Sequence, residues 1–329
     1  MHGPADSRAP VTETVAAIVP THNRTHLLAT TLRTILWQEG VEVEVIVVDD
    51  GSTEDVRRVL DRIGDRRVRM IRHDVPQGVC NARNRGAADA GGAWLAFCDD
   101  DDLWAPDKLR RLMAAAGHGG RDWAYGGAVN VSIELQVLSA RFAPSPERVA
   151  RTLPRWNLIP GGSSNVIVRS AAFAAAGGWD PQLSNLADWD LWARLARQGP
   201  PARVEQPLVG YRVHAGNAST DTALIMREAR RMDGRFGVRL DYGALHHYLA
   251  WVHLRSGRRW PAVAHLVRAA ITPEVLGVAR TVATLAHARV GKAIPAMRPQ
   301  PSRHARVWMA EAETWIARLR SDATDERSA

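Results

Sequence analysis

Apolar runs and amphipathic stretches alternate along the first hundred residues. The apolar or β-branched runs predict four buried strands, over residues 15–19, 41–48, 68–71 and 93–98. Apolar side chains at spacings of three and four predict helices between them, over residues 25–38, 56–63 and 78–90. Strands that alternate with helices form βαβ units, so the pattern predicts an α/β domain whose parallel strands are covered by helices.

Polar and acidic side chains follow three of these four strands. The clusters are Thr21-His22-Asn23, Asp49-Asp50-Gly51-Ser52 and Asp99-Asp100-Asp101-Asp102. In open α/β sheets ligands bind beyond the carboxyl ends of the strands, so the three clusters predict one binding rim. Four consecutive carboxylates repel one another, and a hard cation such as Mg²⁺ or Mn²⁺ relieves that repulsion. The alternative for each cluster is a solvated polar turn, which for the aspartates precedes a helix near Pro106.

Composition and charge narrow the class of protein. The chain has 329 residues, of which 46% are hydrophobic and 24% charged, as in ordinary globular proteins. Its two cysteines, Cys80 and Cys98, suit a reducing cytosol and offer no thiolate metal site. No apolar stretch reaches the roughly 18 residues of a transmembrane helix, and residues 1–14 lack the apolar segment of a signal peptide. We therefore expect a cytoplasmic protein with a disordered N-terminus.

Glycine-rich phosphate-binding motifs are missing from the sequence. There is no GxxxxGK[ST] motif, which argues against a P-loop, and no GxGxxG after the first strand, which argues against an NAD-type fold. A site without a glycine cradle has to neutralise a pyrophosphate in another way. A bound divalent metal is the obvious means.

An ordered set of motifs resembles family 2 glycosyltransferases of the GT-A fold. The motifs are Val19-Pro20-Thr21-His22-Asn23-Arg24, Val48-Asp49-Asp50-Gly51-Ser52, Asn81-Ala82-Arg83-Asn84-Arg85-Gly86 and Phe97-Cys98-Asp99-Asp100-Asp101-Asp102. The resemblance covers roughly residues 15–219 and implies a Rossmann-like nucleotide-diphospho-sugar transferase fold with a mixed central sheet. It implies a catalytic domain over residues 15–220, with a nucleotide-sugar-binding half at 15–110 and an acceptor half at 111–220.

The resemblance also implies roles for single residues on the donor side. The residues implied to bind the donor are Pro20, Thr21, Asn23, Asp49, Asp50, Arg83, Asp99 and Asp100. Asp50 would line the pocket for the base, and Asp99 or Asp100 would reach the ribose. Arg83 would lie near the sugar-nucleotide, and its alternative role is that of an exposed helix charge.

Metal binding is implied for the aspartate run and for a histidine further along the chain. Asp101 would hold the metal on the diphosphate, as part of a DxD-type motif, and Asp102 stays a candidate because four aspartates allow a shift by one. The segment Val209-Gly210-Tyr211-Arg212-Val213-His214, followed by Asn217-Ala218-Ser219, resembles the YRxH…NxS segment of the family. His214 would touch the metal or diphosphate, and its alternative is a purely structural histidine.

A second acidic stretch, Leu186-Ala187-Asp188-Trp189-Asp190, precedes an amphipathic helix. Carboxylates are favoured at a helix start by the helix dipole, so Asp188 and Asp190 need no chemical role on this ground alone. The stretch resembles the ED-type motif of the family, whose aspartate is the catalytic base of inverting enzymes. The resemblance assigns that role to Asp188 ahead of Asp190, although Ala187 stands where the family has Glu.

The last hundred residues differ from the rest in charge. Residues 221–329 hold 18 basic and 10 acidic residues and so account for the whole net charge of +8. Apolar residues at helical spacing predict a basic helical C-terminal region; examples are Val275, Leu276, Val282, Leu285 and the later stripe Trp308, Ala312, Trp315, Ile316 and Leu319. We favour packing of these helices on the enzyme or on a second copy over attachment to anionic lipid.

The sequence thus predicts an inverting glycosyltransferase that depends on Mn²⁺ or Mg²⁺. The resemblance implies a nucleotide-diphospho-sugar donor and a carbohydrate or glycolipid acceptor, in bacterial cell-surface polysaccharide or glycolipid assembly. Two alternatives stay open, a metal-dependent nucleotidyltransferase and a nucleic-acid-binding protein that uses the basic tail. We expect no nucleic-acid partner, and we keep open peripheral contact with the inner face of the plasma membrane and a homodimer through the C-terminal helices.

Overall fold

The computed structural model describes residues 13–214, 221–271 and 301–328 of the chain. The predicted turn at residues 217–219, the apolar positions between 275 and 285, and residues 1–12 of the predicted disordered N-terminus lie outside these ranges. Of that N-terminus, Glu13 is described. Its carboxylate accepts a hydrogen bond from Trp94 Nε1 at 2.7 Å and pairs with Arg169.

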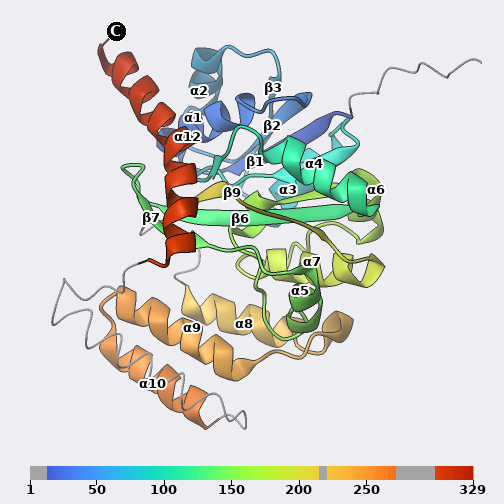
Figure 1. Cartoon of the computed structure of the whole chain (residues 1–329), viewed down its shortest axis with the longest axis vertical. Coiled ribbons are helices and arrows are strands. Elements are labelled where there is room, and N and C mark those ends of the chain that lie inside the picture. The colour runs from blue at the N-terminus through green and yellow to red at the C-terminus, as the bar shows by residue number, and fades with distance from the viewer. Residues whose placement is uncertain (1–12, 215–220, 272–300, 329) are drawn as a thin grey trace, which may run out of the picture.

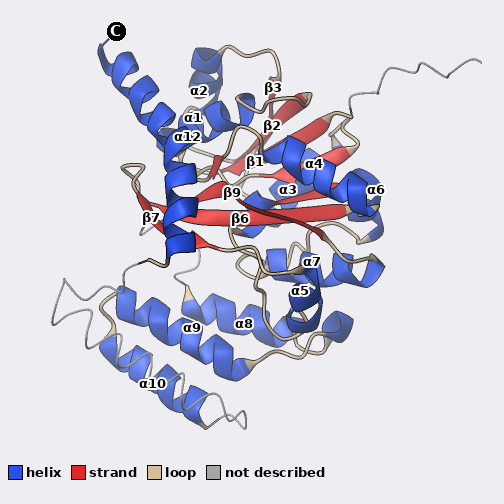
Figure 2. Ribbon diagram, in the orientation of Figure 1, coloured by secondary structure: helices blue, strands red, loops and turns tan. Residues whose placement is uncertain are grey.

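A mixed sheet forms the centre of the molecule (Figure 2). Its first half is parallel, in the order β3-β2-β1-β4, and consists of β1 (Val15–Thr21), β2 (Val43–Asp50), β3 (Val68–His73) and β4 (Trp94–Phe97). The second half continues in the order β8-β6-β9-β5 with β7 beside β6, and consists of β5 (Leu103–Trp104), β6 (Trp123–Val131), β7 (Val137–Arg141), β8 (Val166–Arg169) and β9 (Ala202–Arg212). In this half β8 is antiparallel to β4 and β6, and β6 is parallel to β9. The predicted α/β fold with a mixed sheet is confirmed.

Helices cover both faces of the sheet and bury two separate cores. Successive strand residues point to opposite faces, so Val15, Ala17 and Val19 of β1 belong to one core and Ala16 and Ile18 to the other. The first face is covered by α1 (Thr25–Leu36), α2 (Val56–Ile63), α4 (Lys108–Gly119) and α12 (Arg303–Ser328). The second face is covered by α3 (Val79–Ala88), α5 (Pro146–Thr152), α6 (Ser170–Ala175) and α7 (Ala187–Gln198).

Close packing of α3 on the sheet depends on Gly86. A Cβ at this position would lie 2.6 Å from Cγ2 of Ile18 and 3.1 Å from Cγ2 of Val48, so any larger residue would push the helix away from β1 and β2. The short distance keeps the start of α3 near the carboxyl ends of these strands. Arg83, one turn earlier on the same helix, is thereby fixed beside the strand ends.

The C-terminal region is helical, as predicted, but its parts pack in two places (Figure 1). The helices α8 (Thr222–Met232), α9 (Tyr242–Arg255) and α10 (Arg259–Ala270) form a lobe below the sheet, with a small core of Ile225, Ala229, Leu245 and Leu249. The helix α12 returns to the sheet and contacts β6, β7 and β9. Among the described residues, none of the helices combines the length and apolar content that crossing a bilayer would require.

Packing of α12 should contribute strongly to stability. Trp315 is 7% exposed and lies in the first core, so Trp315→Ala is expected to lower the free energy of unfolding by about 3–5 kcal/mol. Val307 lies on the same helix but is 58% exposed, so Val307→Ala should change it by less than about 0.5 kcal/mol. Urea unfolding of both variants checks this. Equal midpoints for Trp315→Ala and the wild type would contradict the packing.

Candidate active site

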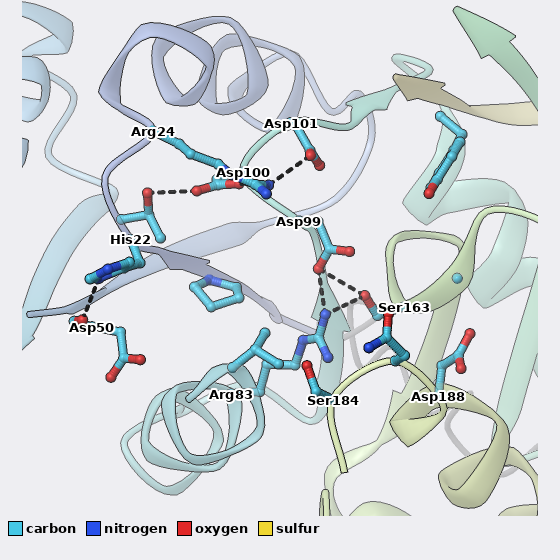
Figure 3. Close-up of a pocket in the computed structure, with 16 residues that line it drawn as sticks. His22, Arg24, Asp50, Arg83, Asp99, Asp100, Asp101, Ser163, Ser184 and Asp188 are labelled. Atoms are coloured by element: carbon cyan, nitrogen blue, oxygen red, sulfur yellow. Dashed lines mark hydrogen bonds and ion pairs between the residues drawn. The ribbon is translucent and has the colours of Figure 1, made fainter. Parts of the chain in front are cut away.

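A cavity of about 360 Å³ opens at the carboxyl ends of the parallel strands (Figure 3). Its walls come from the loops after β1, β2 and β4, from α3, from the turn before β8 and from the start of α7. The lining residues are Pro20, Thr21, His22, Arg24, Asp50, Val79, Arg83, Asp99, Asp100, Asp101, Gly162, Ser163, Ser184, Asn185, Asp188 and Tyr211. Segments up to about 190 residues apart in the chain therefore meet around one space.

Most of the predicted site residues lie on this wall. They are Pro20, Thr21, Asp50, Arg83, Asp99, Asp100, Asp101 and Asp188. Parallel strands end at the same edge of a sheet, and this explains why the three polar clusters of the first hundred residues converge. Asn23, Asp49 and His214 are not among the lining residues.

Asn23 joins the loop after β1 to the loop after β2, and Asp49 orders the loop after β2. Asn23 has a φ of 54°, its backbone amide donates to Ser52 Oγ at 3.0 Å, and its Oδ1 accepts a hydrogen bond from the amide of Thr53 at 2.8 Å. Asp49 is fully buried, and its Oδ1 accepts a hydrogen bond from the amide of Ser52 at 2.9 Å. Both side chains are thus engaged in loop contacts, and their role in donor binding stays a prediction.

Asp50 faces the cavity and also orders the loop after β3. Its carboxylate accepts hydrogen bonds from the backbone amides of Gln77 and Gly78, both at 2.8 Å, and Oδ1 lies 2.7 Å from His73 Nδ1. Burial acts to raise the pKa of Asp50, but the hydrogen bonds with His73 and the two amides outweigh it and lower the pKa. Asp50 therefore stays ionised at neutral pH and fixes this end of the cavity.

Asp99 and Asp100, the first two aspartates after β4, bind different partners. Asp99 accepts hydrogen bonds from Arg83 and, at 3.0 Å, from Ser163 Oγ. Asp100 accepts one from Thr21 Oγ1 at 2.7 Å. Burial and the neighbouring carboxylate together raise the pKa of Asp100 to about 7.

Asp101 and Asp102 also diverge. Asp101 Oδ2 lies 2.8 Å from a guanidinium nitrogen of Arg24 and 2.9 Å from His214 Nε2, so His214 contacts the predicted metal ligand from outside the cavity wall. Asp102 points into the interior, where it accepts a hydrogen bond from Ser164 Oγ at 2.5 Å. Burial raises the pKa of Asp102 well above its usual range. Asp102 thus holds the Ser164 hydroxyl and the Arg212 backbone amide, which is a structural role.

The aspartate run fits a divalent cation. One carboxylate oxygen from each of Asp99, Asp101 and Asp102 lies within 4.8 Å of the others. Hard oxygen ligands of this kind suit Mg²⁺ and Mn²⁺. Arg24 neutralises part of the same charge, and this helps to explain how the cluster is tolerated within the fold.

Arg83 is a buried charge of the cavity wall. It is 5% exposed, donates to Asp99 and Ser163, and lies over the ring of Trp179 with 4.6 Å between its Cζ atom and the ring centroid. The alternative of an exposed helix charge is therefore wrong. In Figure 3 dashed lines join Arg83, Asp99 and Ser163 to one another.

Asp188 lies at the first turn of α7, on the side of the cavity away from Asp50 (Figure 3). Its Oδ1 accepts a hydrogen bond from the amide of Trp189 at 2.6 Å, and Oδ2 lies 3.5 Å from Asn157 Nδ2. Burial raises the pKa of Asp188 to about 6, although the Trp189 amide and the Arg83 charge act to lower it. A carboxylate with this pKa is ionised at neutral pH and basic enough to accept a proton.

Asp190, the alternative to Asp188, has a structural role. It is buried and pairs with Arg194 one turn along the same helix, with 2.6 Å between Nη2 and Oδ2. Arg194 also donates to the carbonyl of Gly178 at 2.7 Å. Asp190 is not among the residues that line the cavity.

Several residues of the cavity were not among the predicted site residues. Arg24 and Tyr211 lie inside quoted motifs, but their importance depends on contacts with the aspartate run or the cavity, far along the chain. Ser184 and Asn185 come from a loop without a motif of its own. Asn157, which is not among the lining residues but contacts Asp188, also lies in such a loop. The signal that could have been used is Arg24, a positive charge in the loop between β1 and α1, because the aspartate run was expected at the same rim.

The fold is the GT-A fold that is found in glycosyltransferases. The structure matches the crystal structure of Staphylococcus aureus TarS 1–349 in complex with UDP-GlcNAc with a TM-score of 0.55, over 84% of this chain and 81% of that one, at 16% identity. It matches the mannosyltransferase PcManGT from Pyrobaculum calidifontis, in complex with GDP-Man and Mn²⁺, with a TM-score of 0.52, over 94% and 86%, at 18% identity. At such identities the likeness shows the fold alone.

The sequence comparisons identify the family. Residues 16–172 match the family model of glycosyl transferase family 2. Succinoglycan biosynthesis protein ExoO of Rhizobium meliloti (strain 1021) is 36% identical over 170 residues, which cover 52% of this chain and 47% of that protein. The β-1,3-glucosyltransferase WfaP of Escherichia coli is 28% identical over 217 residues, which cover 64% and 81%. Residues 16–172 therefore form a glycosyl transferase family 2 region, and the chain spans about half the length of ExoO.

Proposed function

We propose that the chain is an inverting, metal-dependent glycosyltransferase that moves a sugar from a nucleotide-diphospho-sugar to an acceptor hydroxyl. The observation that carries this proposal is the arrangement of one cavity, with Asp50 at one side, the aspartate run in the middle and Asp188 at the other. Such an arrangement provides neighbouring places for the nucleobase of the donor, for its diphosphate and for the acceptor. The match to the family model supports the reaction type.

The acceptor side of the reaction depends on Asp188. We propose that its Oδ2, held near Asn157, takes the proton from the acceptor hydroxyl as the hydroxyl attacks the anomeric carbon. A positioned general base of this kind contributes a rate factor of about 100 to 10,000. Direct displacement inverts the anomeric centre and needs no enzyme nucleophile. Gly162, whose backbone lies beside Asp188, leaves room for the acceptor.

The donor side depends on the strand ends. Pro20, Thr21 and Asp50 would bind the base, and Asp99 or Asp100 the ribose. Asp101 would hold Mn²⁺ or Mg²⁺, with His214 beside it. When bound, the metal stabilises the negative charge on the leaving diphosphate.

The relatives indicate the pathway class. ExoO is named for succinoglycan biosynthesis, and WfaP for transfer from UDP-Glc to α-D-GlcNAc-diphosphoundecaprenol. We therefore propose a carbohydrate or glycolipid acceptor in the assembly of a bacterial cell-surface polysaccharide or glycolipid. The division into a catalytic domain at residues 15–220 and a C-terminal region at 221–329 stays part of this proposal.

Thermal unfolding with nucleotides tests the donor site. UDP, GDP, dTDP and CDP are each added with and without Mn²⁺, and one of them is expected to stabilise the protein only when the metal is present. At about 100 times its dissociation constant a ligand adds about 2.7 kcal/mol to the free energy of unfolding. Stabilisation by no nucleotide in either condition would contradict the proposal. Release of pyrophosphate in place of a nucleoside diphosphate would favour a nucleotidyltransferase.

A further inference from the structure

A second cavity, of about 590 Å³, is lined by residues of α5, of the loop after α5 and of α9. The side chains that matter here are Arg148 and Arg151 of α5, Trp156 of the loop, and Tyr248 and Trp251 of α9. None of them belongs to the donor cavity. We call this second cavity the α5–α9 groove.

The α5–α9 groove is basic. Arg148 and Arg151 are exposed, and in the described part of the chain neither forms an ion pair. Arg155 is a third guanidinium on the wall. The one carboxylate on the wall is that of Asp241, which is engaged in capping α9 by accepting a hydrogen bond from the Ala244 amide at 2.7 Å. Guanidinium groups match the oxygen geometry of phosphates, so the charge predicts a phosphate-bearing ligand.

Aromatic rings line the same groove. Trp156 and Tyr248 meet edge to face with 6.2 Å between ring centroids, and Trp251 beside them is 47% exposed. Aromatic faces bind sugars and hydrocarbon chains, and they supply contact area at little cost in side-chain entropy. The ligand should therefore carry an apolar or saccharide part next to its phosphate.

The α5–α9 groove adjoins the proposed catalytic base. Trp156 lines the groove, and the next residue, Asn157, places its Nδ2 3.5 Å from Asp188 Oδ2. Trp156 also packs against Trp189, the residue after the base, with 5.8 Å between ring centroids. Two consecutive residues therefore join the wall of the groove to Asp188.

An exposed apolar stripe runs along α10, which packs against α9. Its members are Trp260, Val263, Val267 and Ile271, with exposed fractions of 85%, 44%, 56% and 76%. The spacing of three and four places them on one face of the helix. Arg258, Arg259 and Arg268 lie beside the stripe and are exposed. A tryptophan and aliphatic side chains flanked by arginines are typical of helices that lie at a lipid surface.

We propose that the α5–α9 groove binds the phosphate or diphosphate group of a lipid-linked sugar acceptor. Arg148 and Arg151 contact the phosphate oxygens, the aromatic rings contact the first part of the lipid, and the sugar extends past Asn157 to Asp188. The lipid leaves the groove toward the stripe on α10. The proposal rests on the proposed function, because Asp188 is assumed to mark the acceptor hydroxyl.

The test measures binding of farnesyl diphosphate and of farnesol to the full chain by calorimetry. Excess EDTA is present, so that the metal-dependent donor site does not take up the diphosphate. Farnesyl diphosphate is expected to bind at least about tenfold more tightly than farnesol, and the double variant Arg148→Ala/Arg151→Ala to lose at least about tenfold of that affinity. Arg57→Ala, which removes an exposed arginine of α2, is the matched control and should bind like the wild type. Equal affinity of the double variant and the wild type would overturn the proposal.

Two further experiments are needed. The first distinguishes a lipid-linked sugar from a membrane headgroup as the source of the phosphate, and the second distinguishes failure of the groove proposal from failure of the proposed function. Vesicles of phosphatidylglycerol should bind the double variant and the wild type alike. If the double variant instead lost as much affinity for the vesicles as for farnesyl diphosphate, the groove would bind lipid headgroups, and the assignment would be overturned. Asp188→Asn should bind farnesyl diphosphate like the wild type. If the wild type bound farnesyl diphosphate but transferred sugar from no nucleotide-diphospho-sugar, the groove proposal would hold and the proposed function would be wrong.

Discussion

Replacing Asp188 with Asn should lower the rate of sugar transfer about 100- to 10,000-fold and leave nucleotide binding unchanged. The amide keeps the shape of the side chain, and its one oxygen can still accept the hydrogen bond from the Trp189 amide. It loses the acceptor oxygen that faces Asn157 Nδ2, and it cannot accept the proton of the acceptor hydroxyl. Initial rates measure the first effect, and thermal stabilisation by the donor nucleotide measures the second. Near-normal turnover would remove Asp188 from the mechanism.

Asp190→Asn is the matched control for this variant. Asp190 lies two residues further along the same helix, and it pairs with Arg194 away from the cavity. Its replacement weakens a buried ion pair and so should lower the melting temperature, while the rate per folded enzyme stays within a few-fold of the wild type. Equal losses of rate in the two variants would point to damage of the helix.

The pH dependence of the wild type gives an independent measurement of the same carboxylate. Burial raises the pKa of Asp188 to about 6, so the protonated fraction grows as the pH falls through 6. A protonated carboxyl cannot act as a base, and the logarithm of kcat/KM should therefore fall by one per pH unit below about 6. In Asp188→Asn this acid limb should be missing from the residual activity.

Asp101→Ala should abolish the part of nucleotide stabilisation that depends on metal. Asp101 reaches the cavity and lies in the cluster of carboxylate oxygens, so its loss removes a ligand from the proposed cation site. The shift in melting temperature caused by the nucleotide with Mn²⁺ should fall to the value without Mn²⁺. Transfer should drop by at least about 100-fold, because the leaving diphosphate is no longer neutralised.

Asp107→Asn serves as the control for the aspartate variant. Asp107 follows the same run but lies outside the cavity, where it pairs with Arg111 on α4. Removal of its charge should leave the metal-dependent shift unchanged. An unchanged metal response in Asp101→Ala would move the ligand role to Asp99 or Asp102.

The strands and the convergence of the first motifs could be predicted because local patterns determine them. Short apolar runs such as residues 15–19 and 93–98 are typical of strands that are buried on both faces of a sheet. The two strands are parallel, so the segments that follow them lie at the same edge of the sheet. Asp50 and Asp99–Asp101 therefore meet as expected. The resemblance, and not the local pattern, singled out Asp188 as a member of the same cavity.

Directions of single side chains and contacts between distant segments could not be predicted. Nothing local distinguishes Asp101, which faces the cavity, from Asp102, which turns inward to Ser164. The pairing of Arg24 with Asp101 joins residues 77 positions apart, and that of His214 with Asp101 joins residues 113 positions apart. Such contacts depend on how the loops are closed by the whole sheet, which no sequence window contains.

The position of α12 on the first face has a consequence for synthesis on the ribosome. The strands β6, β7 and β9 end by residue 212, whereas the helix that covers them begins at Arg303. At roughly 5–20 residues per second, translation needs about 5–20 s to bridge that gap. During this interval the nascent chain exposes the part of β6, β7 and β9 that α12 later covers. A trigger-factor-like holdase should therefore bind ribosomes stalled near residue 290 far more than ribosomes stalled after residue 329 has emerged.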